Sequence, residues 1–146
     1  MKAPILPALL TLALGCALAR EAGAQASYQQ QIRASLRAAG ARVRGGQPEG
    51  EARMGVSNGG KNASESFDLR AGVHYAVVGV CDENCSDIDL RLFGPTAAKL
   101  AEDVQQNATP VLEFTAPAAG RYRLQIEMVA CSANPCAWGA QLLVVR

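Results

Sequence analysis

The sequence predicts an all-β domain, folded as an antiparallel β-sandwich or jelly roll and preceded by a signal peptide and a short amphipathic helix. Three observations support this prediction. An apolar run opens the chain, a helical period follows it, and a period of two begins after Ser66. Runs with this period of two recur along the chain, separated by glycine and proline, which is the pattern of short antiparallel strands.

The apolar run covers residues 5–19 and follows a short basic start at Lys2. It is shorter than the roughly 18 residues of a membrane helix and matches the apolar region of a signal peptide. Small-x-small sites end at Ala24 and Ala26, so we expect residues 1–26 to be removed and the mature chain to start near Gln25 or Ser27.

Cys16 leaves a second interpretation open. The stretch LALGC that ends at this cysteine resembles a bacterial lipoprotein cleavage site, where the cysteine would carry lipid. Both interpretations predict an exported protein, periplasmic or secreted, and no other stretch of the sequence has the length of a membrane span.

Apolar residues spaced by three or four positions predict a short amphipathic helix at the start of the mature chain: Tyr28, Ile32, Leu36, Ala39 and Val43. The glycine-rich residues 45–60 predict a linker, with one short strand around residues 53–56. We therefore divide the chain into a signal peptide (1–26), a helix with a linker (27–60) and a β-sandwich domain (61–146).

The predicted strands of the domain, in chain order, lie around residues 67–69, 73–80, 88–92, 112–114, 121–129 and 138–145. Residues 73–80 are apolar on both faces, which indicates a strand covered on both sides. The clearest alternation is in residues 121–129, where apolar Tyr122, Leu124 and Ile126 alternate with charged and polar side chains. Two strands start with a glycine and carry a tyrosine soon after it, which we interpret as similar strand entry and not as a repeat.

The formal net charge is +1, and such a balance argues against nucleic acid as a partner. His74 is the only histidine, and no nucleophile stands at a recognised spacing from it, so we predict that the protein is not an enzyme. Trp138, Tyr75 and Tyr122 could form a sugar-binding platform, but aromatic residues at strand spacing are more typical of a core.

Four cysteines remain in the mature chain: Cys81, Cys85, Cys131 and Cys136. In an oxidising compartment an even number of cysteines predicts disulfides, and export argues against a zinc site. Three pairings are possible. We favour the two local ones, 81–85 and 131–136, because each pair flanks a short polar loop at a strand end.

Acidic residues cluster beside the first cysteine pair, and carboxylates are the ligands that calcium prefers. The candidate calcium ligands are Asp82, Glu83, Asp87 and Asp89, with Asn84 and Asp103 as additions. The competing interpretation is that these side chains cap turns or lie on a solvated face.

Three segments together carry a resemblance to a known family: YAVVGVCDENCSDIDLRLFGP from Tyr75, AED from Ala101, and PAAGRYRL from Pro117. They are similar to the bacterial pre-peptidase C-terminal domain, over roughly residues 67–145. The resemblance implies a small β-sandwich associated with secreted peptidases, secretion and substrate adhesion, and in collagenases with calcium and collagen binding. This chain differs in its two cysteine pairs and in having no peptidase attached.

Two functions are compatible with these features. The first is an exported, non-catalytic binding module that recognises an extracytoplasmic protein or glycan surface, with calcium as its candidate stabilising ion. The alternative is a structural protein of the cell envelope with no small ligand.

Overall fold

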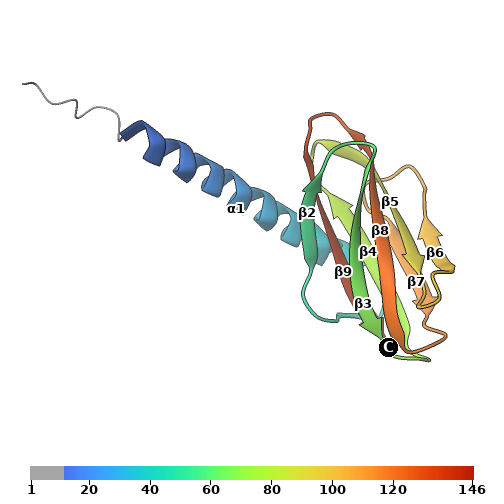
Figure 1. The fold of residues 1–146 in the computed structure, drawn as a ribbon. Helices are drawn as coiled ribbons and strands as arrows, with labels where there is room; N and C mark the ends of the chain where they lie inside the picture. The colour runs from blue at the N-terminus through green and yellow to red at the C-terminus, as the bar shows by residue number, and fades with distance from the viewer. Residues whose placement is uncertain (1–11) are drawn as a thin grey trace, which may run out of the picture.

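The computed structural model describes residues 12–146, which form one α-helix and two antiparallel β-sheets (Figure 1). The elements are α1 (Leu12–Gly40), β1 (Gly46–Pro48), β2 (Arg53–Ser57), β3 (Lys61–Leu69), β4 (His74–Cys81), β5 (Cys85–Phe93), β6 (Lys99–Asp103), β7 (Val111–Thr115), β8 (Gly120–Cys131) and β9 (Cys136–Val145). The predicted antiparallel sandwich is therefore confirmed.

One sheet, sheet A, has the strand order β1-β9-β4-β7, with β2 also paired to β9. The other, sheet B, has the order β3-β8-β5-β6. The central pairs of the two sheets, β4 with β9 and β5 with β8, consist of the longer apolar strands. The sandwich therefore has its most apolar strands at its centre.

The main core lies between the two sheets. The inward side chains of β8 are completely buried, as their alternation predicts: Tyr122, Leu124, Ile126 and Met128. Apolar side chains of β5 and β9 pack against them from both sheets. Burial of one side chain of this size stabilises a fold by about 1.5–3 kcal/mol, so this layer is the main source of stability.

A second, smaller core lies between helix α1 and the outer face of sheet A. Ile32, Leu36 and Ala39 of the helix pack with Ala76 and Val78 of β4. Strand β4 is thus buried on both faces, as its continuous apolar sequence predicts. The molecule consequently has three layers, and only sheet B has a face that no other described element covers (Figure 1).

Helix α1 begins earlier and ends earlier than the predicted amphipathic helix. It extends from Leu12, and its first turns project away from the sandwich (Figure 1). The predicted signal peptide lies partly outside the described residues, so its removal stays a prediction. Within residues 12–146, no helix combines the length and apolar character needed to cross a membrane.

The segment predicted as a linker contributes two strands to sheet A. Strand β1 pairs with the end of β9 and β2 with its start. The strand expected around residues 53–56 is confirmed as β2, whereas β1 was not predicted. The glycine-rich composition suggested a linker, but Gly55 is a strand residue that packs against the indole ring of Trp138. A Cβ at this position would lie 2.7 Å from Cζ2 of Trp138.

Candidate functional site

Two disulfides link the sheets at one end of the sandwich. Cys81 ends β4 in sheet A, and its partner Cys85 begins β5 in sheet B, with their Cα atoms 5.8 Å apart. Cys131 ends β8 in sheet B, and its partner Cys136 begins β9 in sheet A, with a Cα separation of 6.1 Å. The predicted local pairing is confirmed.

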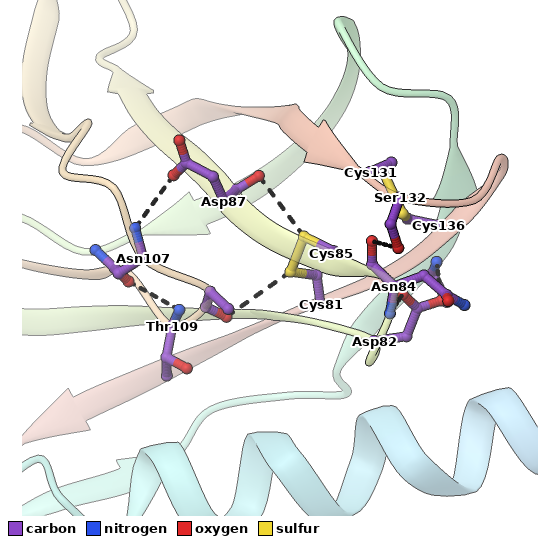
Figure 2. The surroundings of a disulfide bond; sticks show 12 residues. Cys81, Asp82, Asn84, Cys85, Asp87, Asn107, Thr109, Cys131, Ser132 and Cys136 are labelled. Carbon is purple, nitrogen blue, oxygen red and sulfur yellow. Dashed lines mark hydrogen bonds between the residues drawn. A yellow bond between two sulfur atoms is a disulfide. The ribbon is translucent and has the colours of Figure 1, made fainter.

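The two bridges lie close together, because Cys85 and Cys131 are direct partners in the register of β5 and β8. Each bridge holds a chain crossing from one sheet to the other (Figure 2). A bridge that closes so short a loop removes little conformational entropy from the unfolded chain. The chain-entropy relation gives a stabilisation of about 2 kcal/mol per bridge. The bridges therefore fix the shape of the loops more than they raise the stability of the fold.

Hydrogen bonds join the loops that these bridges enclose. The backbone N–H of Ser132 donates to the carbonyl oxygen of Asn84 at 2.7 Å, and its Oγ donates to the same oxygen at 3.0 Å. Asp82 is 3 % exposed, and its carboxylate accepts from the N–H of Ala137 at 2.7 Å and from that of Asn84 at 3.1 Å. The two loops therefore form one connected unit.

A third loop joins this unit. The N–H of Gly59, between β2 and β3, donates to Oδ1 of Asn134 at 2.8 Å. We call residues 58–60, 82–84 and 132–135 together the braced loop end. Its exposed side chains include Glu83, Ser132 and Ala133. This end combines a rigid backbone with accessible side chains, which is the arrangement that binding loops need.

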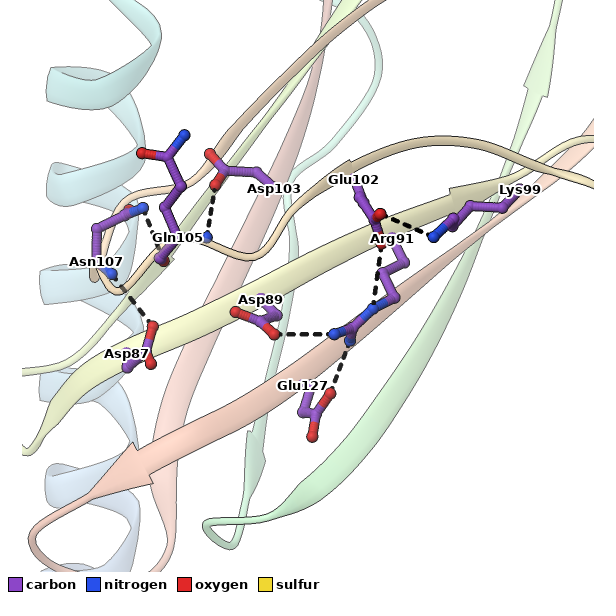
Figure 3. A network of polar contacts seen from close by, with 9 residues as sticks. All are labelled: Asp87, Asp89, Arg91, Lys99, Glu102, Asp103, Gln105, Asn107 and Glu127. Atoms are coloured by element: carbon purple, nitrogen blue, oxygen red, sulfur yellow. Dashed lines mark hydrogen bonds and ion pairs between the residues drawn. The ribbon is translucent and has the colours of Figure 1, made fainter.

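The structure does not assemble the predicted calcium ligands. Asp87 accepts from the N–H of Asn107 at 3.1 Å, and Asp103 accepts from that of Gln105 at 3.2 Å (Figure 3). Asp103 also accepts from the N–H of Val111 at 3.0 Å. Glu83 is exposed at the tip of its loop. Within residues 12–146, no three His, Cys, Asp or Glu side chains are arranged to hold a metal ion. The turn-cap interpretation describes the contacts of Asp82, Asp87 and Asp103 in this structure.

Asp89 belongs to a different group of charges, on the outer face of sheet B. Its carboxylate lies 3.0 Å from Arg91, whose guanidinium also contacts Glu127 at 2.7 Å and Glu102 at 3.6 Å (Figure 3). Lys99 pairs with Glu102 at 2.8 Å. Burial raises the pKa of Asp89, and the nearby Arg91 opposes this rise. Arg91 was not among the candidate residues predicted from the sequence, although its position two residues after Asp89 places both on one face of the strand.

The remaining candidates take structural roles. Tyr75, Tyr122 and Trp138 are all buried in the core between the sheets, as the core interpretation predicts. Nδ1 of His74 lies 3.2 Å from Oγ1 of Thr115, its partner in the register of β4 and β7. This contact is exposed on the surface of the sheet and is the ordinary result of cross-strand pairing.

Comparisons with known proteins identify solved structures with a similar fold but no relative by sequence. No protein-family model matches the chain, and no curated protein sequence matches it. Among solved structures, the pre-peptidase C-terminal domain of a collagenase from Bacillus anthracis is similar, with a TM-score of 0.52 and 12% identity over 63% of this chain and 87% of that domain.

Two weaker similarities involve other β-domains. PliG from Aeromonas hydrophila, a periplasmic inhibitor of g-type lysozyme, has a TM-score of 0.44 and 16% identity over 63% of this chain and 84% of that one. A protein described as CBM4 has a TM-score of 0.43 and 12% identity over 72% of this chain and 81% of that one. The similarity to the collagenase domain shows that the chain has a β-sandwich fold like that of the pre-peptidase C-terminal domain, as the sequence resemblance predicts.

Proposed function

We propose that this chain is an exported, non-catalytic binding module that recognises a protein or glycan surface through the braced loop end. The observation that carries the proposal is the position of the two disulfides. Both close very short loops, both lie at the same end, and both fix loops whose tips are exposed. Placing loops in their bound shape in advance reduces the entropy lost on binding.

Export is part of the proposal. It is supported by the apolar residues 5–19 and by the two disulfides, which are typical of oxidising compartments. Calcium is not part of it, because Asp82, Asp87 and Asp103 accept hydrogen bonds from backbone N–H groups and Asp89 pairs with an arginine.

The test is site-specific photo-crosslinking in the cells that produce the protein. A photoreactive residue replaces Ala133 or Glu83 at the braced loop end, and in a matched control it replaces Glu113, which is exposed on β7. We expect one discrete adduct, protein or glycan, from the two loop positions and none from Glu113. Equal labelling from all three positions, or none from the loop positions, would contradict the proposal.

A second arm separates loop shape from stability. The variant Cys131→Ser/Cys136→Ser removes one bridge, and we expect it to stay folded by circular dichroism because the core between the sheets is intact. Crosslinking from Glu83 should nevertheless fall, because residues 132–135 hold its loop through Ser132 and Asn84. Unchanged crosslinking in a folded variant would show that loop rigidity is not the basis of recognition.

A further inference from the structure

A groove separates helix α1 from the chain that leads through β1 to β2, and we propose that it binds an aliphatic carboxylate of medium chain length. The groove lies on the helix side of sheet A, away from the braced loop end. The inference therefore does not depend on the proposed function, and the two are tested separately.

The size and lining of the groove fit a small amphiphile. Its volume is about 440 Å³, within the range of small-molecule sites. Leu36 of the helix and Leu143 of β9 are buried side chains that line it, and Gly40, Pro48 and Ala52 contribute further apolar surface. No aromatic side chain occurs among the described residues that line the groove, so its surface suits an aliphatic chain better than a stacked ring or a sugar.

One wall of the groove is held in place by hydrogen bonds. The N–H of Glu49 donates to the carbonyl oxygen of Leu142 at 2.9 Å. The side-chain amide of Gln141 lies 3.4 Å from the carbonyl oxygen of Glu49 and 3.3 Å from that of Gly50. The loop after β1 is thereby tied to β9. A ligand would enter a groove that is already formed, which lowers the cost of binding.

Charge identifies the head group of the ligand. Arg33 and Arg37 line the groove one helical turn apart, and both are exposed. In the part of the chain that the structure describes, neither arginine forms an ion pair. Among the described residues of the lining, Glu51 is the only acidic side chain, so the groove carries a net positive charge. Guanidinium groups bind carboxylates through paired hydrogen bonds, and an apolar chain can then lie over Leu36 and Leu143.

The experiment titrates the full chain with decanoate below its critical micelle concentration, using isothermal calorimetry. Decanol and decyltrimethylammonium are titrated in parallel, because they share the chain but not the carboxylate. We expect saturable binding of decanoate at one site and at least about tenfold weaker binding of the other two, as the loss of a charge-assisted contact implies. Equal binding of all three would overturn the proposal, and so would an absence of decanoate binding.

Variants then locate the site. Arg33→Gln/Arg37→Gln should weaken decanoate binding by about tenfold or more, and Glu51→Gln should strengthen it, because it removes the one negative charge of the lining. The matched control, Arg42→Gln/Arg44→Gln, removes the same charge from exposed positions outside the groove and should leave the affinity within about twofold. If the control weakens binding as much as the groove variant, the effect is general electrostatics and the assigned site is wrong.

Discussion

Tyr75 and Tyr122 show at the level of single residues why two stretches of the sequence look alike. Each follows a glycine with positive φ, Gly72 at 76° and Gly120 at 148°. Each directs its hydroxyl back to the backbone upstream: that of Tyr75 accepts from the N–H of Arg70 at 3.2 Å, and that of Tyr122 donates to the carbonyl oxygen of Ala118 at 2.7 Å. The two stretches look alike because both strands begin in the same way, with a glycine of positive φ and a tyrosine whose hydroxyl bonds to the backbone upstream. Tyrosine corners of other β-sandwiches have a similar hydrogen bond.

Asp89 provides a prediction about pH. Its pKa is raised in the folded protein, chiefly by burial. Between the unfolded value of about 3.9 and the higher folded value, the folded state binds more protons, so stability decreases as pH rises through this window. Asp89→Asn removes this titration and leaves Arg91 its contacts with Glu127 and Glu102. In urea unfolding from pH 3 to pH 7, we expect the wild type to lose stability relative to the variant as pH increases.

Asp68 is the matched control for this experiment. Its pKa is lowered, first by the hydrogen bonds from Arg121, which lie at 3.1 and 3.0 Å. The stability that it contributes is therefore present above the unfolded pKa and decreases as pH falls, so Asp68→Asn should show the opposite trend. Because the pair is on the surface, that trend should be the smaller one. If wild type gains stability over Asp89→Asn as pH increases, attraction to Arg91 outweighs burial.

The acidic residues also show which part of the site the sequence could not predict. Their clustering along the chain is real, but the partners of two of these carboxylates depend on the path of a distant loop. Asp87 caps the N–H of Asn107, 20 residues away, and Asp82 caps that of Ala137, 55 residues away. Composition gives the number of carboxylates in a region. It does not give the backbone N–H groups that the fold brings to them.

At the level of elements, the attachment of helix α1 to sheet A depends on one close approach. Gly139 of β9 faces the helix, where an added Cβ would overlap Cγ2 of Ile32 and lie 3.0 Å from Cδ1 of Leu36. We expect Gly139→Ala to destabilise the protein by about 1–3 kcal/mol in urea unfolding, as overpacking does. Gly40→Ala is the control, because its Cβ would lie an ordinary 3.8 Å from Leu143, and its cost should be much smaller.

A double variant tests the origin of that cost. Ile32→Ala alone should destabilise by about 2–5 kcal/mol, because Ile32 is 1 % exposed. In Gly139→Ala/Ile32→Ala the new methyl group occupies space that Ile32 has vacated. The combined cost should then be less than the sum, by about 0.5–3 kcal/mol. Additive costs would mean that Gly139 is required for the backbone of β9 and not for helix packing.

The strands that the sequence predicted and those it did not differ in how they are stabilised. Strands β4, β5, β8 and β9 contribute large apolar side chains to the core, and these produce a visible period or an apolar run. Strand β1 consists of Gly46, Gln47 and Pro48, none of which is buried. It is held by pairing with the last residues of β9. Pairing of this kind leaves no periodic signal in the sequence, so only the structure reveals it.

At the scale of the whole molecule, the layers divide the surface into regions with different properties. Helix α1 covers sheet A, the charged network around Arg91 occupies sheet B, and the disulfides define one end (Figures 1 and 3). Stability comes mainly from the two apolar cores. The exposed side chains of the braced loop end, such as Glu83 and Ala133, can therefore vary in sequence with little cost to the fold.

This arrangement leads to a prediction about calcium that concerns the whole protein. A ligand present at about a hundredfold above its Kd and bound only to the folded state adds about 2.7 kcal/mol, which would raise the melting temperature by several degrees in a domain of this size. Because Asp82, Asp87 and Asp103 already accept backbone hydrogen bonds, we expect the melting temperature to be the same in millimolar calcium and in chelator. Asp87→Asn should change it only slightly and equally in both conditions, since the amide Oδ1 can still accept the hydrogen bond from the N–H of Asn107. A calcium-dependent rise in the wild type that Asp87→Asn abolishes would show instead that these carboxylates rearrange around a metal ion.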